Sequence, residues 1–347
     1  GATAAPSVET PAPSRTKVKN ENAEKSPQPP TAGKGTVGTP KRDGPAKGDR
    51  RIAVVPKGTA HEFWKSVQAG TIRAGKEAGV GVSFTGPARE DDREQQIALV
   101  QNLISGKASA IVLAPLDDRA LVEPVRQAKA AGIPVVIIDS PLQGEAGKDF
   151  VTIVSTDNFK GGQIAGEALA KAMGGKGKAL LLRYNEGSAS TTQREEGFVE
   201  AAKRGGLEVV DPKRYAGVTR ASAQEAAENL LAANGEVSGV FCPNESSAFG
   251  MLLALRSRGM AGKVKFVGFD SSDAVVDAMK KGEIAGLVLQ NPIRMGYLGV
   301  KAAIDALDGK KIETTIDTGA MLVTPENMDK PEVVELLRPN FKELLGG

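Results

Sequence analysis

Short β-branched runs alternate with longer helical patterns from Arg51 onward, and this alternation limits the possible folds more than any other feature of the sequence. A run at 52–55 precedes a helical stretch at 63–78, and the same pair of patterns then recurs along the chain. The next strand candidates are 80–84, 110–114 and 133–138, with helical patterns at 91–105 and 119–131 between them. Strands separated by helices form parallel βαβ units with right-handed crossovers. The sequence therefore predicts an α/β fold built on parallel sheets.

The alternation starts again after a strand candidate at 151–155, which indicates a second lobe of the same kind. Its strand candidates are 179–182, 207–210, 239–241 and 264–268, and its helical patterns are 158–173, 191–204, 222–233 and 246–258. A chain of 347 residues is long enough for two packed domains. We expect two Rossmann-like lobes in series.

Residues 1–50 have a different composition from the rest of the chain. They hold eight prolines and no aromatic residue, Leu, Ile or Met, so we expect a disordered tether that buries too little apolar surface to fold. Nine Lys and Arg face five Asp and Glu there, against 36 and 37 in the remainder, so the basic character belongs to the tether. Without aromatics or dense Arg runs, a solvated spacer is favoured over nucleic-acid binding.

The chain has few residues suited to thiol or metal chemistry and no apolar run long enough to cross a bilayer. Cys242 is the only cysteine and His61 the only histidine, which rules out an intrachain disulfide and a clustered zinc site. Cys242 lies in an apolar run and is expected to be a buried, inert thiol. The longest apolar runs are far shorter than the roughly 20 residues of a membrane-spanning helix. With no initiator Met or apolar signal region, we expect a processed, exported chain.

The loops after the strand candidates combine aromatic rings with carboxylates, amides and a guanidinium. Ligands of open parallel sheets collect at the carboxyl ends of the strands, where these loops lie. Aromatic faces match the C–H faces of a sugar ring, and Asp, Asn, Gln and Arg hydrogen-bond neighbouring hydroxyls. This chemistry favours a polyol ligand. The loops are 57–64, 115–118, 139–141, 185–194, 243–245 and 269–271.

Several of these segments, in their order and spacing, resemble the periplasmic sugar-binding proteins of the ribose/galactose type, which serve ABC importers. The resemblance spans 51–323 and rests on short motifs in both halves of the chain. In the first half they are IAVV at 52–55 followed by EFW at 62–64, GIPV at 132–135 followed by Asp139, and STDN at 155–158 followed by Gly161-Gly162. In the second half they are REEGF at 194–198, VFCPNE at 240–245, VGFD at 267–270 and QNP at 290–292. It implies a non-catalytic receptor without a cofactor that closes over a monosaccharide or polyol. The implied setting is extracytoplasmic, as a monomer that delivers its ligand to a permease, with an N-terminal lipid anchor as one option.

The resemblance also implies site residues and lobe boundaries. The implied lobes are 51–156 with 291–319 and 157–290 with 320–347, joined by hinge crossings near Thr156, Gln290 and Gly319. The Asp-Arg pair frequent in the family is here Asp139-Ser140, and the aromatic expected near Val218 is missing, so the resemblance does not specify ribose. The implied ligand groups are Lys57, His61, Phe63, Trp64, Asp139, Ser140, Arg194, Asn244, Phe269, Asp270 and Gln290.

Ordinary structural roles compete with these assignments. Instead of contacting a ligand, Trp64 could be a core residue of the first helix, and His61 could have a purely structural role. Asp139 and Asp270 are alternatively helix caps, and Arg194 a solvated charge. The paired acids at 91–92 and 117–118 have the pattern of helix N-termini and are left out of the site.

Three other functions compete with this interpretation. A regulator of the LacI type shares the implied fold but needs a helix-turn-helix, which 1–50 lacks the residues to form. A nicotinamide-dependent enzyme would carry Gly-x-Gly-x-x-Gly after its first strand, where this chain has PKGTAH at 56–61. A sugar sensor that reports to a kinase or chemoreceptor stays open beside transport.

Overall fold

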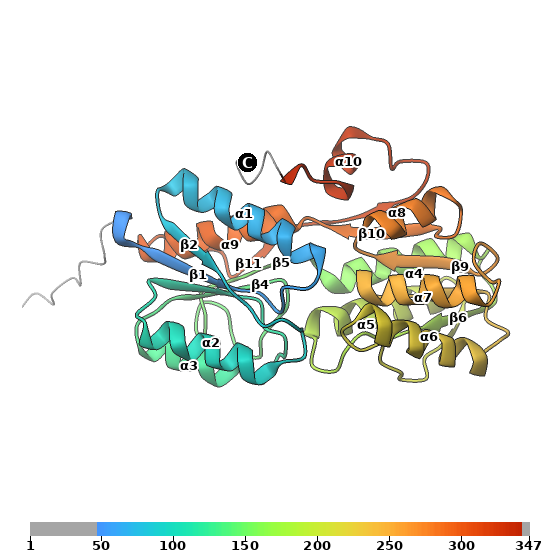
Figure 1. The fold of residues 1–347 in the computed structure, drawn as a ribbon, viewed down its shortest axis with the longest axis horizontal. Coiled ribbons are helices and arrows are strands. Elements are labelled where there is room, and N and C mark those ends of the chain that lie inside the picture. The colour runs from blue at the N-terminus through green and yellow to red at the C-terminus, as the bar shows by residue number, and fades with distance from the viewer. Residues whose placement is uncertain (1–46, 342–347) are drawn as a thin grey trace, which may run out of the picture. The chain divides into compact units, whose positions relative to one another are not determined.

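The computed structural model describes residues 47–341, which form two six-stranded sheets with helices packed on them (Figure 1). Most of the tether predicted at 1–50 lies outside the described residues. Its last four residues are described: Lys47–Asp49 form a 3₁₀ helix, and the buried Arg50 donates to Asp308 at 2.6 Å.

All strands of the first sheet are parallel, as predicted, in the order β11-β5-β4-β3-β1-β2. The central strands β1, β3 and β4 are apolar and almost wholly buried, because helices cover both faces of the sheet. The strands are β1 (Arg51–Val55), β2 (Gly81–Phe84), β3 (Ala110–Leu113), β4 (Val135–Ile138), β5 (Ile153–Ser155) and β11 (Thr315–Asp317). The helices that follow or precede them are α1 (Glu62–Ala78), α2 (Arg93–Ser105), α3 (Val122–Ala130) and α9 (Pro292–Leu307).

The second sheet repeats this plan in the order β12-β10-β9-β8-β6-β7. Its one departure from the predicted parallel arrangement is the edge strand β12, which pairs antiparallel with β10. The strands are β6 (Lys178–Leu181), β7 (Glu208–Val210), β8 (Gly239–Phe241), β9 (Lys265–Phe269), β10 (Gly286–Gln290) and β12 (Ala320–Val323). The helices are α4 (Asn158–Ala172), α5 (Ala189–Arg204), α6 (Arg220–Ala233), α7 (Glu245–Ser257), α8 (Asp273–Lys280) and α10 (Pro331–Leu337).

The chain passes between the two sheets three times: after β5, after β10 and between β11 and β12. The crossings are bonded to one another. The Thr156 hydroxyl donates to the side chain of Gln290 at 2.9 Å, and the Thr318 amide donates to the Ser155 carbonyl at 3.0 Å. We call the part around the first sheet the first lobe and the part around the second sheet the second lobe. The residue boundaries of the lobes stay a prediction.

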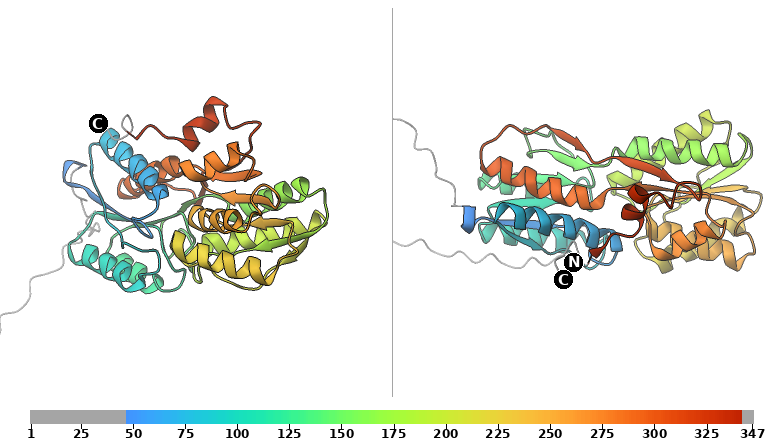
Figure 2. Two further views of the ribbon diagram at one scale, coloured as in Figure 1. Left: turned by 45° about the vertical axis from the view of Figure 1, so that its right-hand side comes forward. Right: turned by 90° about the horizontal axis from the view of Figure 1, so that it is seen from above.

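Closely packed helix pairs are a shared feature of the two lobes. In the first lobe α1 lies along α9, and the two run side by side in the right-hand view of Figure 2. A Cβ added at Gly70 of α1 would lie 1.9 Å from the Ile293 carbonyl oxygen of α9. In the second lobe α4 lies along α5, and a Cβ at Gly162 would lie 2.0 Å from the Arg194 carbonyl oxygen. Glycine is required at both positions because the helix backbones touch.

The prediction for Cys242 is confirmed. The thiol is fully buried in the apolar core of the second lobe, and this burial raises its pKa well above the ordinary value. Within 47–341, no helix has both the length and the apolar character that a bilayer crossing requires.

Candidate functional site

A polar pocket lies between the lobes, at the carboxyl ends of the strands of both sheets. Lys57 and Asp139 follow β1 and β4 in the first lobe, while Asn244 and Asp270 follow β8 and β9 in the second. The loops of both sheets thus meet at one place, as expected for parallel α/β sheets. The lining residues are Lys57, His61, Glu62, Phe63, Trp64, Glu90, Asp139, Tyr184, Ser190, Thr191, Arg194, Asn244, Glu245, Asp270, Ser271 and Gln290.

The first lobe contributes a buried ion pair. The Lys57 ammonium lies 3.0 Å from a carboxylate oxygen of Asp139, and both side chains are only 4% exposed. Lys57 also donates to the Ser190 hydroxyl of the second lobe at 2.9 Å. Because a lone buried charge would be strongly destabilised, each group compensates the burial of the other.

The second lobe contributes a guanidinium fixed on several sides. Arg194 is buried, and its Nε donates to the Asn158 side chain at 2.9 Å. Its Nη1 donates to the Pro243 carbonyl at 3.0 Å, and the Phe269 ring lies under the guanidinium at 4.1 Å. Burial lowers the pKa of Arg194 from its ordinary value, and Asp270 acts in the opposite direction. The planar group is held in one orientation facing the pocket.

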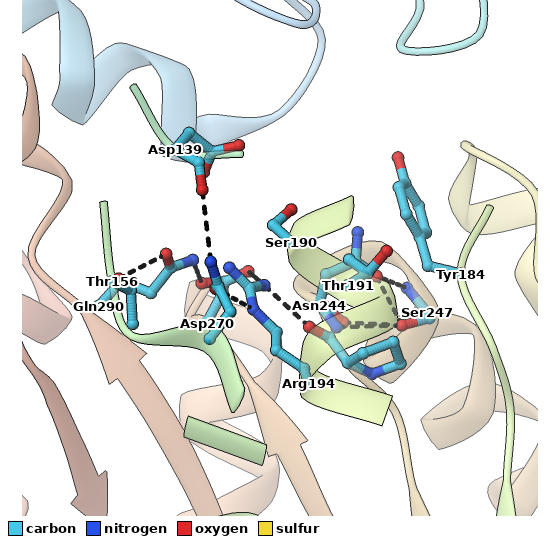
Figure 3. Close-up of polar contacts among 12 residues, drawn as sticks. Asp139, Thr156, Tyr184, Ser190, Thr191, Arg194, Asn244, Ser247, Asp270 and Gln290 are labelled. Carbon is cyan, nitrogen blue, oxygen red and sulfur yellow. Dashed lines mark hydrogen bonds and ion pairs between the residues drawn. The ribbon is translucent and has the colours of Figure 1, made fainter. Parts of the chain in front are cut away.

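Asp270 lies opposite Arg194 and links the site to the hinge. Its carboxylate is 3.8 Å from the Arg194 guanidinium, and one oxygen accepts a hydrogen bond from Gln290 at 2.7 Å. Gln290 in turn accepts from Thr156 at the first crossing. Figure 3 shows Asp139 on one side of the site and Arg194, Asp270 and Gln290 on the other. Burial raises the pKa of Asp270, and the nearby Arg194 opposes that rise.

The aromatic pair at the start of α1 lines the same pocket. The rings of Phe63 and Trp64 meet edge to face with centroids 5.0 Å apart. Trp64 is only 3% exposed and packs in the first-lobe core, and it also lines the pocket. The core position considered as its alternative therefore applies together with its place in the pocket. Phe63 is partly exposed.

Glu90 is a site residue that the sequence analysis did not single out. It is buried between β2 and α2, and one of its carboxylate oxygens accepts from the Trp64 indole nitrogen at 2.7 Å. The other oxygen accepts from the Tyr184 hydroxyl at 2.8 Å, and His61 Nε2 lies 3.9 Å from the first oxygen. Neither Glu90 nor Tyr184 falls in the loops marked from the sequence, whereas the other additional lining residues do.

Nine of the eleven residues implied by the resemblance line the pocket, and two lie behind it. The Ser140 hydroxyl is buried and accepts from the Ser190 amide at 3.0 Å. Phe269 is buried beneath Arg194. Both therefore support residues that face the pocket. The ligand role of each residue stays a prediction.

The capping alternatives are resolved by the helix starts. Asp157 and Ser272 occupy the N-cap positions of α4 and α8, so Asp139 and Asp270 are not helix caps. Asp92 caps α2 by accepting from the Gln95 amide, as expected of a helix N-terminal acid. Asn244 caps α7 while it also lines the pocket.

Fold and site together define a two-lobed receptor for a small polar molecule. Comparison with known proteins places the chain within this class: residues 52–311 match the family described as "Periplasmic binding protein domain". The chain belongs to this family. Its members are solute-binding proteins of transporters and not enzymes, which confirms the resemblance seen in the sequence.

Individual relatives agree with this assignment. The ribose import binding protein of Bacillus subtilis is 32% identical over 76% of this chain and 83% of its own length. A solute-binding protein of Agrobacterium radiobacter, solved with D-arabinose, is 36% identical with a TM-score of 0.80 over 84% of this chain and 100% of that chain. A solute-binding protein of Agrobacterium vitis, solved with D-fucose, is 37% identical with a TM-score of 0.79, over 83% of this chain and 99% of that chain.

Proposed function

We propose that this protein captures a neutral monosaccharide or polyol between its lobes and delivers it to the permease of an ABC importer in the periplasm. The observation that carries the proposal is the convergence of Asp139, Arg194 and Asp270 with the Phe63 and Trp64 rings on one pocket. Each lobe supplies a carboxylate and a cation, so a ligand bound there is held from both sides. Closure of the lobes then forms the complex that a permease recognises.

The balance of charge favours a neutral ligand. Lys57 faces Asp139 and Arg194 faces Asp270, so each cation already has an anionic partner. An anionic ligand would have to compete with these carboxylates and with Glu90, whereas sugar hydroxyls donate to the carboxylates and accept from the cations. An aromatic ring beside them provides the apolar surface for the C–H face of the ring.

Relatives support the size class of the ligand. One of the proteins compared above is a ribose import binding protein, and the other two were solved with D-arabinose and D-fucose. All three sugars are monosaccharides. The family resemblance implies small polar residues in ribose binders where this chain has Lys57 and His61, so we include hexoses, 6-deoxyhexoses and cyclic polyols beside the pentoses.

A thermal-shift screen tests the proposal. The panel contains D-ribose, D-arabinose, D-fucose, further aldoses and ketoses, inositols, amino acids and nucleotides. A ligand at 100 times its dissociation constant adds about 2.7 kcal/mol of stability, so a true ligand raises the melting temperature clearly. We expect at least one sugar or polyol to do so. A shift with an amino acid or nucleotide and with no sugar would contradict the proposal.

A further inference from the structure

Glu90 is bonded to both lobes, and its position suggests a role beyond lining the pocket. It belongs to the first lobe, in the loop between β2 and α2, whereas Tyr184 belongs to the second lobe, three residues after the end of β6. The bond from the Tyr184 hydroxyl to the Glu90 carboxylate, 2.8 Å long, therefore joins the lobes. Both residues are buried, with 8% and 1% of their surfaces exposed.

Each end of this bond is held rigidly within its own lobe. On the first-lobe side, the second oxygen of Glu90 accepts from the Trp64 indole at 2.7 Å. On the second-lobe side, the Tyr184 amide donates to Glu195 at 2.9 Å, and Glu195 is paired with Arg183 at 2.6 Å. In Figure 3 the Tyr184 hydroxyl points toward the side of the view on which Asp139 lies.

The ionisation of the pair suits this bond. Burial acts to raise the pKa of Glu90, but His61, Lys57 and the bonds from Trp64 and Tyr184 bring it below its ordinary value. Burial raises the pKa of Tyr184 well above its ordinary value, and the charge of Glu90 adds to this effect. The carboxylate is therefore the acceptor and the phenol the donor. Hydrogen bonds to buried charged groups are stronger than those between neutral groups.

We propose that Glu90 and Tyr184 form a latch that stabilises the closed lobes and, through the shared carboxylate, fixes Trp64 against the bound sugar. The proposal rests on the proposed function, because the latch acts on the complex with ligand. Parting of the lobes separates the Tyr184 hydroxyl from Glu90 and leaves the carboxylate with its first-lobe neighbours Trp64 and His61. Glu90 is thus a positioning residue, and the latch slows the dissociation of the bound ligand.

The test compares Tyr184→Phe with a matched control. Tyr297→Phe also removes a tyrosine–glutamate hydrogen bond, that between Tyr297 and Glu77 at 2.7 Å, but this bond is exposed and lies within the first lobe. The probe is the panel sugar that binds the wild type most tightly. Stopped-flow fluorescence of Trp64, the single tryptophan, gives the association and dissociation rates, and small-angle scattering gives the closed fraction at a fixed ligand concentration.

We expect Tyr184→Phe to release the sugar roughly tenfold faster with little change in the association rate, which corresponds to about 1.4 kcal/mol. Its closed fraction at subsaturating ligand should fall below that of the wild type. Tyr297→Phe should match the wild type in both measurements. Circular dichroism and the melting temperature without ligand show whether each variant is folded.

The same substitution made in a Glu90→Leu variant distinguishes a latch from a direct contact of Tyr184 with the sugar. In Glu90→Leu the hydroxyl has no acceptor, so adding Tyr184→Phe should cause no further loss of affinity. A full additive loss would mean that the hydroxyl binds the sugar itself, and wild-type release rates in Tyr184→Phe would mean that the bond does not stabilise closure. Either result overturns the latch while the proposed function stands. If the wild type binds no sugar of the panel, the proposed function fails and the latch fails with it.

Discussion

Asp139 and Asp270 occupy equivalent places in the two lobes. Each follows a strand, each has a positive φ, of 65° and 64°, and each lies beside a cation of its own lobe. Non-glycine residues rarely adopt this left-handed conformation, and such strain is found preferentially at functional sites. Both carboxylates line the pocket between the lobes, and the N-cap positions of α4 and α8 belong to other residues.

Arg194 owes its orientation to the shape of the guanidinium, and this can be tested. Arg194→Lys keeps the charge but loses the bonds to Asn158 and Pro243 together with the planar stacking on Phe269. We expect sugar affinity to fall roughly 10- to 100-fold, as for lost hydrogen bonds of a charged group. Arg204→Lys is the control, because Arg204 lies on the same helix and is half exposed. Equal affinities of the two variants, measured by calorimetry, would exclude Arg194 from the site.

Some site residues were accessible to sequence analysis and others were not. Asp139, Asn244 and Asp270 follow recognisable strands, so the rule for parallel sheets locates them without knowledge of the tertiary structure. Glu90 follows a short, half-exposed edge strand and precedes an acidic helix start, where a carboxylate has no distinctive pattern. Its partner Tyr184 is 94 residues away, and no local signal connects the two.

At the scale of elements, the strand–helix alternation predicted most of the fold. Buried strands such as β3 and β4 are continuous apolar runs, and the helices between them have clear stops. The predicted alternation ends at 268, so the later helices and strands were not predicted from it, and among them the edge strand β12 pairs antiparallel with β10. The double glycine at 161–162 belongs to the family resemblance, and the contact of α4 with α5 supplies the physical reason for Gly162.

That contact leads to a prediction about Gly162. A methyl group there would collide with the backbone of α5 at Arg194, so Gly162→Ala must push the two helices apart and shift the guanidinium. Overpacking of this kind costs typically about 1–3 kcal/mol, and we expect weaker sugar binding beside the loss of stability. Gly235→Ala is the control, since no atom lies within 4 Å of its added Cβ. Urea unfolding and calorimetry measure both effects. A Gly162→Ala variant with the wild-type midpoint and affinity would show that the helices do not position Arg194.

At the scale of the whole binding unit, the account requires that both lobes hold one ligand. The lobes already share hydrogen bonds through Lys57 and Ser190, through Ser140 and the Ser190 amide, and through Asp118 and Gly187. These contacts lie on the side of the pocket formed by the loops, whereas the three chain crossings are bonded to one another near Thr156 and Gln290. Rotation about the crossings would open the pocket without disturbing the core of either lobe.

A calorimetric titration of the wild type, Asp139→Asn and Asp270→Asn with the best sugar of the panel tests this claim most directly. We predict one sugar per chain, and an affinity at least roughly tenfold weaker in each variant, because each loses a carboxylate acceptor from a different lobe. Asp273→Asn, a change at an exposed residue three positions beyond Asp270, should bind like the wild type. Wild-type affinity in both Asp139→Asn and Asp270→Asn, with folded proteins, would place the sugar outside this pocket and contradict the account.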